Sequence, residues 1–132
     1  MSSDPTIIQG GMGAGVSNWR LARAVSQLGH LGVVSGTALD QILARRLQDG
    51  DPGGHMRRGL AHFPVREMAE RIEREYFIPG GKSENSPYKI LPLHDKDGPR
   101  EREELCFAAN FVEVFLARQG HDNPVGINYL EK

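Results

Sequence analysis

The fold class is decided by the stretch Leu31-Gly32-Val33-Val34-Ser35-Gly36. It is a short apolar run that lacks polar alternation and ends at a glycine. Such a run is typical of a strand in a parallel sheet, because helices cover both faces of that kind of sheet. We therefore expect a buried strand over residues 31–35 that ends at Gly36.

A helical pattern flanks this strand on each side. Before it, Ser17 is expected to cap a helix that carries Leu21, Val25 and Leu28 on its apolar face, with Ala22 on the adjoining line. After it, residues 37–50 repeat the helical period. The apolar positions of this second helix are Leu39, Ile42, Leu43 and Leu47.

Two further strands are expected, at residues 6–9 and 124–130. The first is rich in β-branched residues and stops at a glycine cluster, and the last is an apolar run that follows a proline. Residues 50–100 interrupt the alternation of strands and helices, because they are rich in Pro and Gly and carry one amphipathic helix after Pro64.

The last helix has two possible starting points. Asn110 and Glu113 have the spacing of a capping box ahead of an apolar run, which predicts a helix that continues to Gly120. Residues 105–109 are then either its first turns or a strand. They contain Cys106, the single cysteine, for which we expect a buried and inert thiol.

Together these elements predict an α/β fold, the first βα units of a TIM-type (β/α)8 barrel. A closed barrel takes eight strands and about 250 residues, whereas the sequence has 132 residues and supports three strands. We therefore expect residues 1–132 to be an incomplete, N-terminal fragment of such a barrel, with residues 50–100 as an irregular and helical excursion.

Charge and composition exclude several classes of function. The formal net charge is −1 and no long run of Lys or Arg is present, so neither nucleic-acid binding nor membrane-surface binding is expected. The first 15 residues lack the features of a secretory signal, which predicts a cytoplasmic protein. The five histidines lack metal-ligand spacing, so we expect no metal site.

The glycine cluster at residues 10–15 is the strongest indication of a ligand site. Glycines let backbone N–H groups approach a phosphate or a flat ring, although a flexible turn has the same composition. The spacing does not fit a dinucleotide fingerprint, because Val16 or Asn18 stands where a third glycine is needed. Asn128 is a second candidate, since it is polar near the end of an apolar strand; its alternative is a turn residue tied to backbone.

Two other patterns are weaker indications of a site. Gly81-Lys82-Ser83 matches the end of a P-loop but lacks the first glycine and the preceding strand, so we interpret it as chance. Arg57 and Arg58 have two interpretations, contact with an anionic group or, more commonly, a solvated helix face.

Three stretches of the sequence carry a family resemblance. They are Ile7-Ile8-Gln9-Gly10-Gly11-Met12-Gly13 with Val16-Ser17, the stretch at residues 31–36, and Val125-Gly126-Ile127-Asn128. In this order they resemble the first three strands of the nitronate monooxygenase family, formerly called 2-nitropropane dioxygenases. The resemblance implies an FMN-dependent βα barrel that oxidises alkyl nitronates with molecular oxygen.

The same resemblance implies which residues meet the cofactor. The family's catalytic histidine and most of its FMN-phosphate site belong to later strands, so we expect no catalytic residue in this chain and no activity of the chain alone. The implied FMN-binding residues lie where the three strands end: Gly10, Gly11, Met12, Gly13, Ser35, Gly36 and Asn128.

Two alternatives remain open for the function. A flavin-dependent enoyl-acyl carrier protein reductase or an NAD(P)H:quinone reductase of the same fold looks similar over the first strands. The other alternative is a non-enzymatic small α/β domain in which the glycine turn only connects two elements. The substrate, the electron donor and the oligomeric state are not predicted.

Overall fold

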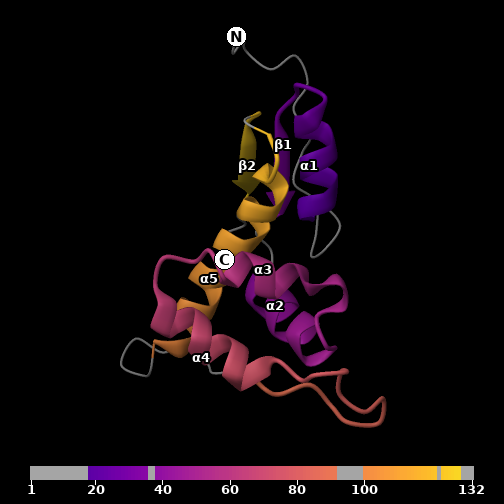
Figure 1. Cartoon of the computed structure of the whole chain (residues 1–132), viewed down its shortest axis with the longest axis vertical. Helices are drawn as coiled ribbons and strands as arrows, with labels where there is room; N and C mark the ends of the chain where they lie inside the picture. Colours follow the sequence, from indigo (N-terminus) through magenta and orange to yellow (C-terminus); the bar gives the residue numbers. More distant parts are fainter. Residues whose placement is uncertain (1–17, 36–37, 92–99, 122, 129–132) are drawn as a thin grey trace. The chain divides into compact units, whose positions relative to one another are not determined.

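The computed structural model describes residues 18–35, 38–91, 100–121 and 123–128. This part of the chain is mixed α/β and mostly helical, with a two-strand parallel sheet (Figure 1). The predicted strand at residues 6–9 lies outside it. The elements in chain order are α1 (Trp19–Gln27), β1 (Gly32–Ser35), α2 (Leu39–Gln48), the 3₁₀ turn η1 (Pro52–Gly54), α3 (His55–Leu60), α4 (Arg66–Tyr76), α5 (Glu101–Arg118) and β2 (Val125–Asn128).

The chain divides into two compact units, which we describe separately. The first unit comprises the described residues of Met1–Leu39 and Glu113–Lys132, and it contains the sheet and α1. The second unit is Asp40–Val112 and is helical in its described part.

The sheet joins two strands that lie far apart in the sequence. β1 and β2 are parallel and in register, from Gly32 opposite Val125 to Ser35 opposite Asn128. Val34, in the middle of β1, is fully buried. Both strands fall within the predicted runs, and the predicted parallel α/β class is confirmed.

The helix α1 packs very closely on β1 because the strand begins with a glycine. A Cβ atom on Gly32 would lie 2.0 Å from the carbonyl oxygen of Ala22, so the backbone of α1 occupies the space that any other side chain would need. The buried face of the helix consists of Trp19, Ala22 and Ser26. Small residues at the contact therefore determine which face of α1 meets the sheet.

The predicted apolar face of α1 is confirmed for Ala22 and wrong for the two leucines. Leu21 is 41% exposed and Leu28 is 77% exposed, while Ala22 between them is fully buried. Larger side chains do not fit a contact in which two backbones lie this close, so Leu21 stays partly exposed on α1 and Leu28 is exposed at its C-cap.

The N-terminus of α1 has two polar caps. The side-chain oxygen of Asn18 accepts hydrogen bonds from the backbone N–H groups of Arg20 and Leu21, both at 3.1 Å. The N-cap is thus one residue later than the predicted Ser17, which lies outside the described residues. The second cap is Glu113, whose Oε2 accepts a hydrogen bond from the backbone N–H of Trp19 at 3.0 Å.

Glu113 is a buried carboxylate, 2% exposed, that comes from a distant part of the sequence. A helix N-terminus favours such a group, because its first N–H groups have no partner within the helix and the helix dipole is positive there. The predicted capping box between Asn110 and Glu113 is wrong, since both residues lie inside α5 and Glu113 caps α1 instead.

Two further hydrogen bonds connect α1 with the segment that leads into β2. The hydroxyl of Ser26, which is fully buried, donates to the carbonyl oxygen of Pro124 at 2.7 Å. Arg23 Nε donates to the carbonyl oxygen of Gln119 at 3.0 Å. The first unit is therefore held by polar contacts on α1 as well as by the packing of α1 on β1.

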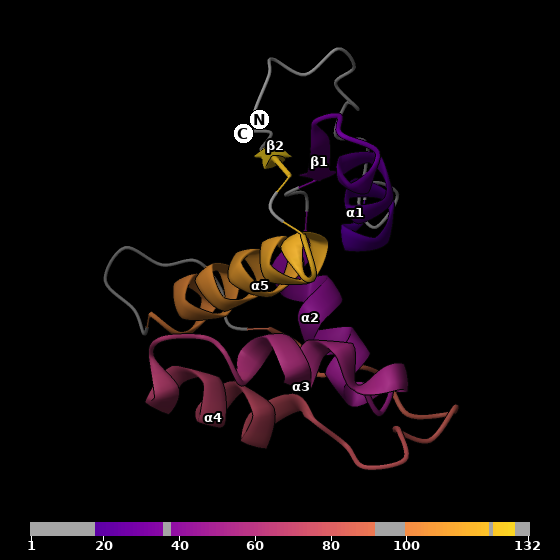
Figure 2. The ribbon, with the colours of Figure 1, turned by 45° about the horizontal axis from the view of Figure 1, so that its top comes forward.

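The second unit has an apolar core between its helices. Figure 2 shows the ribbon of these helices from a second direction. α2 and α4 carry the predicted periodic residues, and both helices are confirmed. Gly59 of α3 lies so close to α5 that a Cβ there would be 2.7 Å from Val112 Cγ1. The buried apolar residues of this unit are Leu43, Ala44, Leu47, Met56, Leu60, Phe63, Ala69, Ile72, Tyr76, Leu105, Ala108, Ala109 and Val112.

α3 is a short helix that the sequence analysis does not predict. Its N-terminus is capped by Asp51, which precedes the intervening turn η1. The Asp51 carboxylate accepts hydrogen bonds from the backbone N–H groups of Met56 and Arg57, each at 3.0 Å. The turn η1 thus brings this buried carboxylate to the start of a helix.

The helix α5 begins at Glu101, nine residues before the predicted start at Asn110. Residues 105–109 are therefore helical and do not form a strand. Asn110 donates from Nδ2 to the carbonyl oxygen of Cys106 at 2.7 Å, one turn back along the helix. Its side chain therefore bonds to the backbone in the middle of α5 and does not cap a helix start.

We predict that Gly32→Ala destabilises the first unit by about 3 kcal/mol or more, because the new methyl group would overlap the backbone of Ala22. Gly126→Ala is the matched control in the partner strand. A Cβ there would meet Val33 Cγ2 at an ordinary 3.7 Å, so its effect should stay below about 1 kcal/mol. Urea unfolding monitored by fluorescence of Trp19, the single tryptophan, measures both. Equal stability of the two variants would contradict the proposed close packing.

Removal of the Asp51 carboxylate should loosen the start of α3. Asp51→Ala leaves the Met56 and Arg57 amides without their acceptor and should cost about 2 kcal/mol, whereas Asp51→Asn keeps one acceptor oxygen and should cost less. Hydrogen exchange at these two amides provides a local measurement. Glu70→Ala, an exposed change on α4, is the control, and unchanged protection in Asp51→Ala would show that the cap is unimportant.

Candidate functional site

The carboxyl edge of the β1–β2 pair is the site that the sequence analysis predicts. The strand register makes Ser35 and Asn128 direct neighbours at the last position of the pair. Ligands of parallel α/β domains bind beyond the carboxyl ends of the strands. Two of the predicted site residues are therefore brought together at the expected edge.

The other predicted residues lie outside the part of the chain that the structure describes. These are the glycine-rich stretch at residues 10–13, which comprises Gly10, Gly11, Met12 and Gly13, and also Gly36. Their assignment to the site stays a prediction.

Arg57 has a structural role within the second unit. Its Nε lies 3.0 Å from Asp51 Oδ2, and its guanidinium lies 4.3 Å from the centre of the Phe77 ring. The anionic group that Arg57 meets is thus a carboxylate of its own chain. Arg58 Nη1 lies 2.9 Å from His55 Nδ1 on the same short helix.

No group of three or more metal-ligating side chains occurs among the described residues. His62 Nδ1 lies 3.0 Å from the carbonyl oxygen of Arg58, one turn back along the chain. His121 uses both ring nitrogens locally: Nε2 lies 2.7 Å from the carbonyl oxygen of Ala117, and Nδ1 lies 3.1 Å from the backbone N–H of Asn123. These histidines serve local backbone structure.

Cys106 lies half-buried on α5, less enclosed than the sequence analysis predicts. Burial raises the pKa of its thiol, and the negative charge of Asp40 raises that pKa further; the Asn110 amide and Arg102 act in the opposite direction. A thiol with a raised pKa is a weak nucleophile at neutral pH. The predicted absence of nucleophilic activity at this position agrees with this environment.

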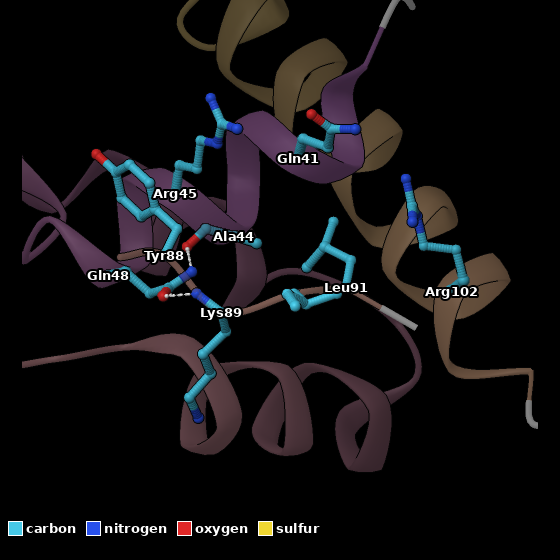
Figure 3. Close-up of a pocket in the computed structure, with 9 residues that line it drawn as sticks. Gln41, Ala44, Arg45, Gln48, Tyr88, Lys89, Leu91 and Arg102 are labelled. Carbon is cyan, nitrogen blue, oxygen red and sulfur yellow. Dashed lines mark hydrogen bonds between the residues drawn. The ribbon is translucent and has the colours of Figure 1, made fainter. Parts of the chain in front are cut away.

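A cavity in the second unit is not indicated by the sequence analysis (Figure 3). It has a volume of about 380 Å³ and lies between α2, the start of α5 and the chain at residues 88–91. Its polar rim includes Gln41 and Arg45 from α2 and Arg102 from α5. No single stretch of sequence contains this set, and only the spacing of four between Gln41 and Arg45, which places both on one helix face, is visible without the structure.

The chain at residues 77–91 is attached to the end of α2. The amide of Gln48, a buried residue, accepts a hydrogen bond from the backbone N–H of Lys89 at 2.8 Å and donates to the carbonyl oxygen of Ala44 at 3.0 Å. The Tyr88 hydroxyl donates to Asp49 at 2.7 Å, and this hydrogen bond raises the pKa of the Tyr88 phenol. One wall of the cavity is therefore fixed by hydrogen bonds.

The stretch Gly81-Lys82-Ser83, which matches the end of a P-loop, lies against the end of α2. A Cβ on Gly81 would lie 2.8 Å from the carbonyl oxygen of Asp49, and Gly81 has a φ of +85°. The backbone N–H of Lys82 donates to the carbonyl oxygen of Gln48 at 2.8 Å. The glycine is needed for a turn that lies against α2, which is a structural role.

Comparison of the chain with protein-family models, with curated proteins and with solved structures finds no significant match. Among the helices that the structure describes, none has both the length and the apolar character needed to cross a membrane.

We predict that Cys106 is alkylated by iodoacetamide more slowly in the folded protein at pH 8 than in the urea-unfolded protein. The raised pKa leaves less thiolate at that pH, so the rate should continue to rise beyond the pH at which the unfolded thiol is fully ionised. Mass spectrometry of timed samples measures the rate. Faster labelling in the folded state would mean that the environment activates this thiol.

Proposed function

We propose that this chain forms the first part of an FMN-dependent oxidoreductase of the nitronate monooxygenase type, in which the carboxyl edge of β1 and β2 borders the flavin. The observation that carries the proposal is the in-register parallel pairing of the two strands, with Ser35 beside Asn128 at its end. The family resemblance assigns an FMN contact to these same two positions.

The chemistry of this edge fits a flavin. An asparagine amide offers both a hydrogen-bond donor and an acceptor, and a serine hydroxyl offers the same two functions. A flavin ring presents carbonyl oxygens and ring N–H groups at its polar margin, so neutral amide and hydroxyl groups are suitable partners. FMN, when bound, supplies the redox chemistry of the oxidation, and this chain holds and orients it.

The first unit also has the local architecture expected of a βα barrel. A barrel places a layer of helices outside its parallel strands, and α1 packs directly on β1 through Ala22 and Gly32. Leu28, the C-cap residue of α1, is 77% exposed. Outer helices of a barrel pack against their neighbours, so an apolar side chain in this position supports the proposal of a larger domain.

The proposal is tested by FMN binding to the purified full-length protein. We expect flavin absorbance or saturable quenching of added FMN fluorescence, and we expect Asn128→Ala to weaken FMN binding by about tenfold through loss of one hydrogen bond to the flavin. Asn123→Ala is the matched control, since Asn123 precedes β2 and lies away from its carboxyl edge. The absence of FMN binding, or equal binding by the two variants, would refute the proposal.

The substrate class is tested separately with the FMN-loaded protein. Oxygen consumption that depends on an added alkyl nitronate supports the monooxygenase proposal. Oxidation of NAD(P)H with a quinone or an enoyl thioester, without nitronate turnover, would instead identify the enzyme as a reductase of the same fold.

A further inference from the structure

The cavity in the second unit has a rim rich in hydrogen-bond donors. Gln41 and Arg45 lie one turn apart on the same face of α2, and Arg102 of α5 lies across the cavity from them (Figure 3). These side chains carry an amide and two guanidinium groups. A guanidinium group donates hydrogen bonds and accepts none, so its natural partner is an oxyanion.

None of the described residues that line this cavity carries a carboxylate, and three carboxylates close to it are already engaged. Asp40 pairs with Arg102, Asp49 accepts the hydrogen bond of Tyr88, and Glu75 lies 3.5 Å from Lys89 Nζ. Lys89 points towards α4 and so adds no free charge to the rim (Figure 3).

Arg45 is the rim cation that is available for a ligand. Within the described part of the chain it makes no ion pair, and its guanidinium lies 5.2 Å from the centre of the Tyr88 ring. It is an exposed side chain on a well-formed helix. Cation–π contact of this kind holds the guanidinium in place without neutralising its charge.

Ala44, Ile90 and Leu91 add apolar surface to the cavity. Leu91 projects between α2 and Arg102 (Figure 3), the methyl group of Ala44 lies at the base of the helix face, and Ile90 is 95% exposed. An exposed isoleucine beside a donor-rich rim is suited to a ligand that has one charged end and one short apolar end.

We propose that this cavity binds a small organic oxyanion, a phosphate or carboxylate group attached to a short alkyl chain. Arg45 and Gln41 bind the oxyanion, Arg102, which is paired with Asp40, lines the opposite side, and Leu91 covers the alkyl chain. Gln48 and Tyr88 hold residues 88–91 on α2, so the cavity exists before the ligand arrives. Because all the described lining residues belong to Asp40–Val112, this site is separate from the proposed FMN site.

The probes are butyl phosphate, butanoate, inorganic phosphate and 1-butanol, each titrated into the full-length protein by isothermal calorimetry. We expect saturable binding of at least one of the first two at roughly 1 mM, weaker binding of inorganic phosphate, and no binding of 1-butanol. The stronger of butyl phosphate and butanoate identifies the oxyanion. Butanol binding as strong as that of both anions, or no saturable binding of either anion, would overturn the proposal.

Arg45→Gln should weaken binding of the preferred anion by about tenfold, through loss of one charge-assisted hydrogen bond. Gln41→Glu, which adds a negative charge to the rim and preserves the helix, should weaken it as well. The matched control is Arg20→Gln on α1, which also removes an exposed arginine held 4.6 Å from the centre of an aromatic ring, that of Trp19. Wild-type affinity in both cavity variants, or an equal loss in Arg20→Gln, would overturn the proposal.

Discussion

The parallel pairing of β1 with β2 is the constraint on which the first unit depends. Residues 32–35 pair with residues 125–128, so the two neighbouring strands are joined by a long connection. The entropic cost of closing such a loop grows only slowly with its length, but contacts formed near the strands must still offset it. The Ala22–Gly32 contact, the Ser26 hydrogen bond to Pro124 and the Glu113 cap supply such contacts, and all of them involve α1.

The long connection is possible because most of it forms a unit with its own core. Four helices bury leucines, alanines and aromatic rings against one another within Asp40–Val112, and Phe63 and Phe111 meet edge to face at 5.2 Å between ring centres.

Each unit also contains a buried carboxylate that caps a helix. Glu113 in the first unit and Asp51 in the second each accept hydrogen bonds from the unpaired N–H groups at a helix start, so burial of the charge is offset by hydrogen bonds and by the helix dipole.

The sequence predicts the helices and strands that have a strong periodicity. It does not predict features that depend on contacts between residues far apart in the chain. β1, β2, α2 and α4 follow from apolar runs and helical spacing. The buried face of α1 does not, because the closeness of Gly32 to Ala22 outweighs the hydrophobicity of Leu21 and Leu28. The capping-box pattern at residues 110–113 is misleading, since the Glu113 carboxylate meets Trp19. The cavity at α2 was also beyond prediction, because its lining comes from three separated segments.

The strand pair ends in two polar residues, Ser35 and Asn128, which stabilise a sheet less than apolar residues do. Along the register, Gly32, Val33 and Val34 meet Val125, Gly126 and Ile127, which suits strands covered on both faces; only the last pair, Ser35 with Asn128, is polar on both sides. Asparagine is disfavoured in strands, so a valine there would extend the sheet more stably. The register therefore places this polar pair at the carboxyl edge of the strands, which is the edge that the proposed cofactor site would use.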